Sequence, residues 1–176
     1  MMAKILIIYS TTDGHTRTIC LHLQKVIEQQ AHQVTLISID DALHADLTPF
    51  DKIVMGASIR YGKHHAKVYE FIKRNQQMLE STPSALFSVN LVARKVEKRQ
   101  PETNPYMKKF LKQIAWQPGE MAVFAGKLDY QKYSFWDRSI IRLIMWITKG
   151  PTAPDTLRDF TDWKQVDAFG KVISEM

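Results

Sequence analysis

A hydroxyl-rich loop near the start of the chain contains the residue types that bind phosphate groups. It follows an apolar run at residues 5–8 and opens a segment with helical periodicity. Its members are Ser10, Thr11, Thr12, Asp13, Gly14, His15 and Thr16. A loop between a buried strand and a helix presents unpaired backbone N–H groups at the positive end of the helix dipole, and hydroxyl groups add donors. Gly14 allows the backbone to turn closely around an anion, so the loop predicts a phosphate site.

The spacing within this loop argues against two common classes of nucleotide site. The loop has neither the GxxxxGK(S/T) spacing of a Walker-type site nor the GxGxxG spacing of a dinucleotide site. A hydroxyl-rich loop without lysine suits a phosphate monoester, such as that of FMN. An ordinary helix cap rich in serine and threonine is the alternative interpretation of the same residues.

Size and composition indicate one globular domain over residues 1–176. The chain is 45% hydrophobic, which allows a sizeable core, and no stretch resembles a flexible linker. Its start passes into a strand-like run without a signal-peptide pattern, so we expect a cytoplasmic protein. The single cysteine, Cys20, falls in an apolar helical pattern and is expected to be a buried structural thiol. The six histidines show no metal-ligand spacing, and no metal is predicted.

The charge of the chain favours anionic partners. A formal net charge of +6 and a pI near 9.4 suit nucleic acid, acidic lipid headgroups or an acidic small molecule. No recognition-helix pattern, zinc finger or aromatic RNA-binding strand accompanies this charge. We therefore predict no nucleic-acid partner.

Strand-like and helical patterns alternate along the chain. Short apolar runs predict five strands, at residues 5–9, 34–39, 53–57, 85–89 and 122–125. Helical patterns lie between and after them, at residues 19–27, 68–79, 107–114 and 163–173. Thr161 is the predicted cap of the last helix. Alternation without hairpin turn signals predicts an α/β fold with a doubly wound, five-stranded parallel sheet and helices on both faces.

Three segments follow the predicted strands at the edge where such sheets bind ligands. The segments at residues 58–65 and 90–99 are both basic. After the last strand, residues 126–155 form a long aromatic and basic insertion relative to a minimal five-stranded sheet. Ligands bind beyond the carboxyl ends of parallel strands, so these segments should carry the function.

Together these features resemble a flavodoxin, a fold whose members hold FMN between the same loops. The resemblance becomes specific in three blocks, which are Gly56-Ala57-Ser58-Ile59-Arg60-Tyr61-Gly62, Ser88-Val89-Asn90-Leu91-Val92-Ala93-Arg94-Lys95 and Thr161-Asp162-Trp163. Over essentially the whole chain, the sequence resembles the menaquinone-dependent protoporphyrinogen IX dehydrogenases of bacterial haem synthesis. That family implies a six-electron oxidation of protoporphyrinogen IX to protoporphyrin IX, with FMN passing electrons to a membrane quinone, either menaquinone or ubiquinone.

The resemblance and the loop positions predict the FMN site. Its residues are those of the phosphate loop, Ser10, Thr11, Thr12, Asp13, Gly14, His15 and Thr16, together with Ser58, Ile59, Arg60, Tyr61, Gly62, Ser88, Val89, Asn90, Leu91, Val92, Ala93, Gly126 and Tyr130. Ile59 and Tyr61 are expected against one face of the isoalloxazine ring and Tyr130 against the other. Core packing is the alternative role of these apolar side chains.

A porphyrinogen is a large apolar ring with two propionates, so its site needs apolar surface and a few cations at the rim. The predicted cations are Arg60, Lys63, Arg94 and Lys95. A solvated basic surface is the alternative interpretation of each. His64 or His65 could relay a proton, or the two could begin the following helix and face solvent.

The apolar run at residues 140–147 is too short to span a bilayer and is interrupted by Arg142. Aromatic and basic residues beside it predict a segment lying at the cytoplasmic face of the inner membrane, while a helix packed in the core remains open. The alternative functions are an electron-transfer flavodoxin, an NAD(P)H:quinone reductase and a nucleic-acid-binding module without FMN. The sequence also leaves open whether the protein forms a homo-oligomer.

Overall fold

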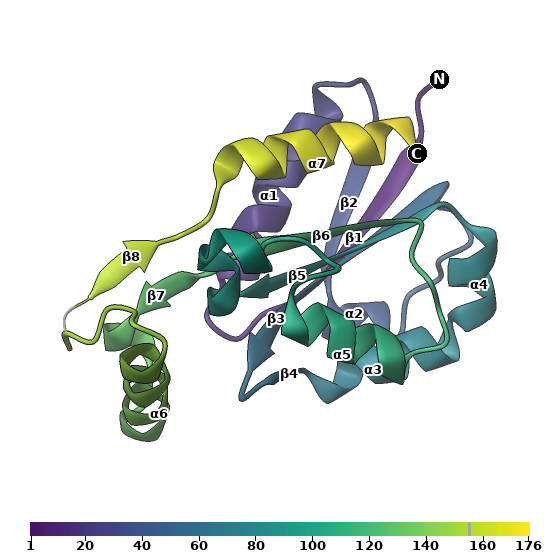
Figure 1. Ribbon diagram of the computed structural model, residues 1–176. Helices are drawn as coiled ribbons and strands as arrows, with labels where there is room; N and C mark the ends of the chain where they lie inside the picture. The colour runs from purple at the N-terminus through teal and green to yellow at the C-terminus, as the bar shows by residue number, and fades with distance from the viewer. Residues whose placement is uncertain (155) are drawn as a thin grey trace.

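A computed structural model describes residues 1–154 and 156–176. Its central sheet has five parallel strands in the order β2-β1-β3-β5-β6 (Figure 1). Their bounds are β1 Lys4–Ser10, β2 Gln33–Ser38, β3 Lys52–Arg60, β5 Ser84–Asn90 and β6 Glu120–Ala125. Each strand overlaps one of the predicted apolar runs, so the predicted parallel sheet is confirmed.

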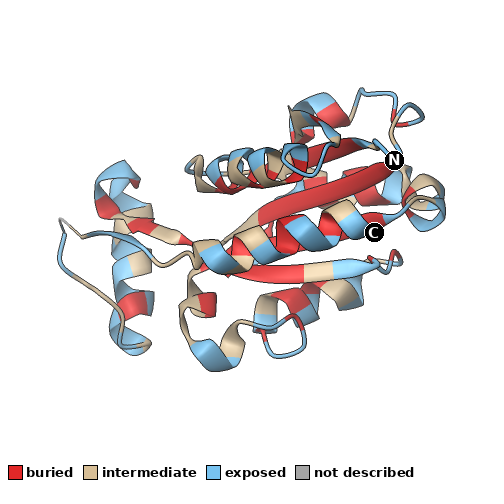
Figure 2. Ribbon diagram, turned by 90° about the horizontal axis from the view of Figure 1, so that it is seen from above, coloured by how far each residue is buried: buried red, intermediate tan, exposed pale blue. Residues whose placement is uncertain are grey.

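Helices cover both faces of this sheet, as predicted (Figure 1). On one face lie α1 (His15–Glu28) and α7 (Trp163–Glu175), which pack together. The other face is covered by α2 (Ile39–Ala42), α3 (Ala66–Arg74), α4 (Gln76–Ser81) and α5 (Pro105–Gln113). Alternate residues of β1 divide between the two cores, because successive strand side chains point to opposite faces. Figure 2 shows the buried strands running between partly exposed helices.

Two helix boundaries differ from the prediction. The helix predicted over residues 68–79 is split at Asn75, whose backbone N–H and side-chain Nδ2 both donate to the Phe71 carbonyl. Asparagine competes with the helical backbone in this way, and a periodicity count does not detect it. The cap of α7 is Asp162 instead of Thr161, because the Asp162 carboxylate accepts from the Lys164 and Gln165 N–H groups.

A hairpin that the sequence analysis missed follows β3. The short strand β4 (Lys63–His64) pairs antiparallel with the end of β3 across a two-residue turn. Tyr61 and Gly62 form the turn with positive φ angles of 53° and 77°, as tight hairpin turns require. The expectation that His64 faces solvent is therefore wrong, since it is only 3% exposed, whereas His65 caps α3 and is exposed.

The segment after β6 builds a separate lobe beside the sheet (Figure 1). It contains β7 (Lys127–Asp129), the 3-10 turn η3 (Tyr130–Lys132), helix α6 (Phe135–Ile147) and β8 (Leu157–Asp159), which pairs antiparallel with β7. Asp155, the last residue of the predicted insertion, lies outside the described residues. A small core of Leu128, Tyr130, Tyr133 and Met145 holds this lobe together. Only Met145 of α6 is fully buried, so most of the helix surface faces outward.

Candidate functional site

A cavity of about 430 Å³ lies at the carboxyl ends of the parallel strands. Its walls come from the loops after β1, β3, β5 and β6, as predicted, and from helix α6. The predicted residues that line it are Thr11, Thr12, Asp13, His15, Thr16, Ser58, Ile59, Arg60, Tyr61, Gly62, Val89, Asn90, Leu91, Val92, Arg94 and Gly126. The folded chain thus brings four segments, distant in sequence, to one edge of the sheet.

Seven predicted site residues do not line this cavity, namely Ser10, Gly14, Lys63, Ser88, Ala93, Lys95 and Tyr130. Tyr130 is fully buried inside the lobe, where its hydroxyl donates to the Pro151 carbonyl at 2.6 Å. Its side chain therefore does not form the second face of the cavity. Tyr133, three residues later, lines the cavity instead.

The phosphate loop has the geometry of an anion site. Gly14 caps α1 with a φ of 87°, and its N–H donates to Thr11 Oγ1 at 2.9 Å. The hydroxyl of Thr16 lines the cavity, is buried, and has no hydrogen-bond partner among residues 1–154 and 156–176. The first turn of α1 has no acidic residue. A buried hydroxyl without a partner is costly unless a ligand satisfies it, so these residues fit the phosphate of a bound flavin mononucleotide.

The Asp13 carboxylate in this loop is paired across the cavity wall. Arg60 Nη2 donates to Asp13 Oδ2 at 2.5 Å, and the guanidinium lies over the Tyr133 ring, 5.0 Å from its centroid. Arg60 Nε is buried and has no acceptor in the part of the chain that the structure describes. One side chain from β3 therefore joins the phosphate loop to the lobe that carries α6.

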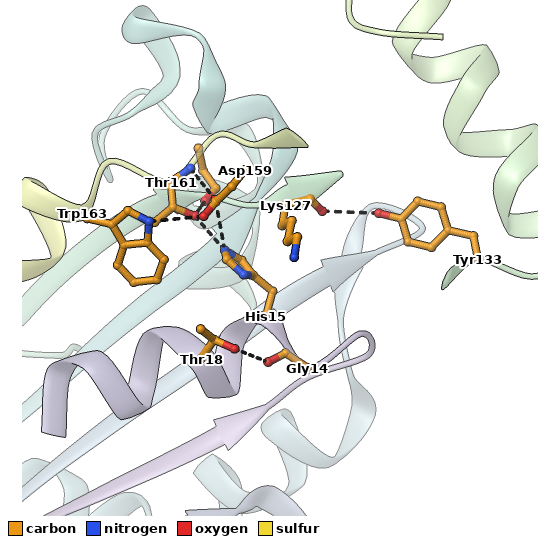
Figure 3. A network of polar contacts seen from close by, with 9 residues as sticks. Gly14, His15, Thr18, Lys127, Tyr133, Asp159, Thr161 and Trp163 are labelled. Atoms are coloured by element: carbon orange, nitrogen blue, oxygen red, sulfur yellow. Dashed lines mark hydrogen bonds and ion pairs between the residues drawn. The ribbon is translucent and has the colours of Figure 1, made fainter. Parts of the chain in front are cut away.

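A second polar cluster ties the same loop to the end of β8 (Figure 3). The Thr161 hydroxyl donates to the Ala125 carbonyl, so it accepts a hydrogen bond from His15 Nε2 at 2.7 Å. Asp159 lies 3.6 Å from the same nitrogen. Burial outweighs this carboxylate and, with Lys127 and Lys132 nearby, lowers the pKa of His15. The imidazole is thus a neutral donor near neutral pH.

A buried network shapes the loop after β5. Asn90 Nδ2 donates to Ser88 Oγ, and the Ser88 hydroxyl therefore donates to His64 Nε2 at 2.9 Å. Asn90 Oδ1 accepts from the Ala93 N–H and from Asn104 Nδ2. Burial lowers the pKa of His64 to about 4, so the ring is a neutral acceptor. The Asn90 side chain is fully used within the protein and fixes the turn η1 (Leu91–Arg94) that forms one cavity wall.

Arg94, a predicted substrate cation, has internal acceptors. Its Nη1 donates to the Leu91 carbonyl, and its Nη2 donates to the carbonyl and hydroxyl of Thr148, the residue that caps α6. Lys63 is exposed on β4, and Lys95 lies beyond η1. The four predicted cations therefore do not converge on one point of the cavity.

Helix α6 supplies a cavity wall that the sequence analysis did not assign. The apolar residues that line the cavity from this helix are Ile140, Ile141, Ile144 and Met145. Tyr106, Lys127 and Tyr133 also line the cavity and were missed. The spacing of the four α6 residues puts them on one helix face, which could have indicated a packing surface but not its partner. The cavity therefore has a hydroxyl-rich end and an apolar end.

Among residues 1–154 and 156–176, no group of three or more histidine, cysteine, aspartate or glutamate side chains is arranged to hold a metal ion. Cys20 is fully buried, and burial raises the pKa of its thiol, which confirms the prediction of a structural cysteine. No described helix is both long enough and apolar enough to cross a bilayer.

Comparisons with known proteins agree with this architecture. Residues 6–155 match the family model described as a flavodoxin domain. The protoporphyrinogen IX dehydrogenase (quinone) of Escherichia coli strain K12 is 42% identical over 98% of this chain and 96% of its own length. The protein of that name from Leishmania major is 41% identical over 94% of this chain and 72% of its own. The solution structure of two-electron reduced flavodoxin from Megasphaera elsdenii, 11% identical, covers 98% of this chain and 99% of its own with a TM-score of 0.54.

Proposed function

The chain belongs to the flavodoxin-domain family of protoporphyrinogen IX dehydrogenases (quinone), and on that premise we propose that it oxidises protoporphyrinogen IX to protoporphyrin IX. We propose FMN as its cofactor and a lipid-soluble quinone, menaquinone or ubiquinone, as its electron acceptor. This would be a late step of haem synthesis.

The two-ended cavity is the observation that carries this proposal. Its hydroxyl-rich end has a helix N-terminus and the unpartnered Thr16 hydroxyl, which suit a phosphate monoester. Its apolar end is formed by α6 and suits a large apolar ring. Its volume of about 430 Å³ falls within the usual range of small-molecule sites, about 300–1,000 Å³.

A bound flavin would supply the redox chemistry, accepting electrons from the porphyrinogen and releasing them to a quinone. The protein's own side chains would bind the flavin and orient it. Thr11, Thr16 and the first N–H groups of α1 would hold the phosphate, while the hairpin after β3 and the turn η1 would flank the ring. The His64–Ser88–Asn90 network would keep η1 rigid, because each member has its partners inside the protein.

Among the cations that line the cavity, Lys127 is the best candidate for a substrate carboxylate. Arg60 and Arg94 already have internal acceptors. Lys127 lines the cavity and, within the residues described, forms no ion pair. An ammonium group without a carboxylate partner beside an apolar cavity suits a propionate of the substrate. Lys63 and Lys95 remain candidates for longer-range attraction of an anionic substrate.

We further propose that α6 lies at the cytoplasmic face of the cell membrane. Trp136 and Trp146 are 74% and 73% exposed, and Leu143 and Ile147 are also exposed. Basic side chains accompany this apolar surface, as in helices that lie in the headgroup region. Because the same helix forms the apolar cavity wall, a quinone dissolved in lipid would have a short path to the cavity.

An anaerobic assay with protoporphyrinogen IX tests the proposed reaction. We expect the purified, FMN-loaded protein to form fluorescent porphyrin at a rate that rises with added menaquinone or ubiquinone. A quinone-dependent rate no higher than that of spontaneous oxidation would overturn the proposal. Rapid quinone reduction by NADH or NADPH, without porphyrinogen oxidation, would favour an NAD(P)H:quinone reductase instead.

A further inference from the structure

The phosphate loop contains a carboxylate where an anion is expected to bind. Asp13 immediately precedes Gly14, the cap of α1, and lines the same cavity as Thr11 and Thr16. A carboxylate beside a phosphate dianion opposes binding, because like charges repel most strongly where water is partly excluded. A loop that binds phosphate therefore needs a device that offsets the charge of Asp13.

Arg60 is placed to offset the charge of Asp13. Its Nη2 lies 2.5 Å from Asp13 Oδ2, and the two side chains are only 19% and 31% exposed. The Tyr133 ring covers the guanidinium from the lobe side at 5.0 Å. A partly buried ion pair with one partner held by an aromatic ring keeps its geometry better than an exposed pair of flexible side chains.

We propose that Arg60 is a positioning residue for the cofactor, which offsets the Asp13 carboxylate and so allows the loop to accept the phosphate dianion of FMN. This inference rests on the proposed use of FMN. Asp13 in turn fixes Arg60 in the cavity wall. Phosphate affinity therefore depends on a residue of β3, 47 positions away in the sequence.

A double-mutant cycle with two flavins tests the proposal. Arg60→Gln, Asp13→Asn and the double variant are titrated as apoproteins with FMN and with riboflavin, which lacks the phosphate. Arg60→Gln should weaken FMN affinity by about tenfold and riboflavin affinity much less, because only the phosphate meets the uncompensated carboxylate. Asp13→Asn should change FMN affinity by less than about threefold, and the double variant should recover most of the loss caused by Arg60→Gln.

Salt gives an independent readout. The FMN defect of Arg60→Gln should shrink as ionic strength rises toward about 1 M, where the screening length falls to about 3 Å. A residue that only supported the fold would show neither this salt dependence nor rescue by Asp13→Asn. Lys67→Gln is the matched control, because it breaks an ion pair with Asp40 on the surface and outside the cavity.

The outcomes separate this inference from the proposed function. If the double variant binds FMN as weakly as Arg60→Gln, Arg60 contacts the ligand directly and the inference is wrong. Equal losses of FMN and riboflavin affinity would also overturn it, because the effect would not involve phosphate. If the wild-type protein binds FMN but all three variants bind it with the same affinity, only the inference fails. Absence of FMN binding by the wild type would overturn both the inference and the proposed function.

Discussion

Arg94 joins the loop after β5 to the end of helix α6 through Thr148. Its Nη2 lies 3.1 Å from the Thr148 carbonyl oxygen and 2.8 Å from the Thr148 hydroxyl. The sequence predicted that this guanidinium binds a substrate carboxylate, but the fold uses its donors to hold a cavity wall. Helix α6 has one fully buried residue, and this contact helps to fix its position together with the hydrogen bonds from Arg138 to the Tyr130 carbonyl and from Arg142 to the Thr152 carbonyl.

Arg94→Ala should therefore impair substrate use more than cofactor binding. We expect the KM for protoporphyrinogen IX to rise by about tenfold, because α6 loses one of the contacts that hold it against the cavity, while FMN affinity changes by less than about threefold. Arg94→Lys should raise the KM almost as much as Arg94→Ala, since an ammonium group lacks the forked donors that reach Leu91 and Thr148 together. Steady-state kinetics and FMN titration measure the two effects, with Lys73→Ala, exposed on α3 and outside the cavity, as control. Equal losses of substrate use and of FMN affinity would assign Arg94 to the cofactor site.

Gly14→Val should weaken FMN binding and so lower the FMN content of the purified protein. Gly14 has a φ of 87°, and a Cβ there would meet no atom within 4 Å, so the cost is backbone strain rather than a clash. That strain is on the order of 1–3 kcal/mol and falls on the loop that holds the phosphate. The absorbance of bound flavin in purified protein measures the effect. Gly119→Ala, away from the cavity, is the control, and normal FMN content in Gly14→Val would refute the role of the loop.

Acid should destabilise the protein through His64. Burial lowers the pKa of His64 to about 4 from 6.5, so between these values the unfolded chain binds a proton that the folded protein does not. The free energy of unfolding therefore falls as pH drops from 6.5 toward 4, by up to about 3 kcal/mol from this residue. Urea unfolding at pH 7 and pH 4 measures the loss.

His64→Gln provides the comparison for this pH effect. Glutamine can still accept from the Ser88 hydroxyl but does not titrate, so the variant should lose less stability between pH 7 and pH 4 than the wild type. Identical losses in the two proteins would show that His64 does not carry the acid sensitivity.

Membrane attachment should depend on the exposed tryptophans of α6. The double substitution Trp136→Ser and Trp146→Ser should weaken binding to vesicles that contain anionic lipid by about tenfold or more, because two large interfacial side chains are removed. Sedimentation with vesicles measures the bound fraction. Leu21→Ser removes an exposed apolar residue of α1 and should leave binding unchanged. Unchanged binding of the double variant would exclude α6 as the attachment surface.

Local patterns in the sequence were sufficient to predict the parallel sheet and the phosphate loop. The five apolar runs predict the parallel strands because a strand buried on both faces must be apolar along its length. The glycine and hydroxyl residues before α1 indicate an anion site because their conformation and donors act within a few residues. The resemblance of three short blocks to a known family was enough to predict the reaction, although it could not say what each residue contacts.

Tertiary structure alone decided how the cavity is walled and which cations remain for ligands. Asp13 meets Arg60 across 47 positions, and Arg94 meets Thr148 across 54. No local periodicity encodes such pairs, because they depend on where the crossovers and the lobe bring the chain together. The same reason explains why Tyr130 is buried in the lobe while Tyr133 lines the cavity. The sequence by itself determined the sheet and the anchor for a phosphate, and the packing of distant segments determined the rest of the site.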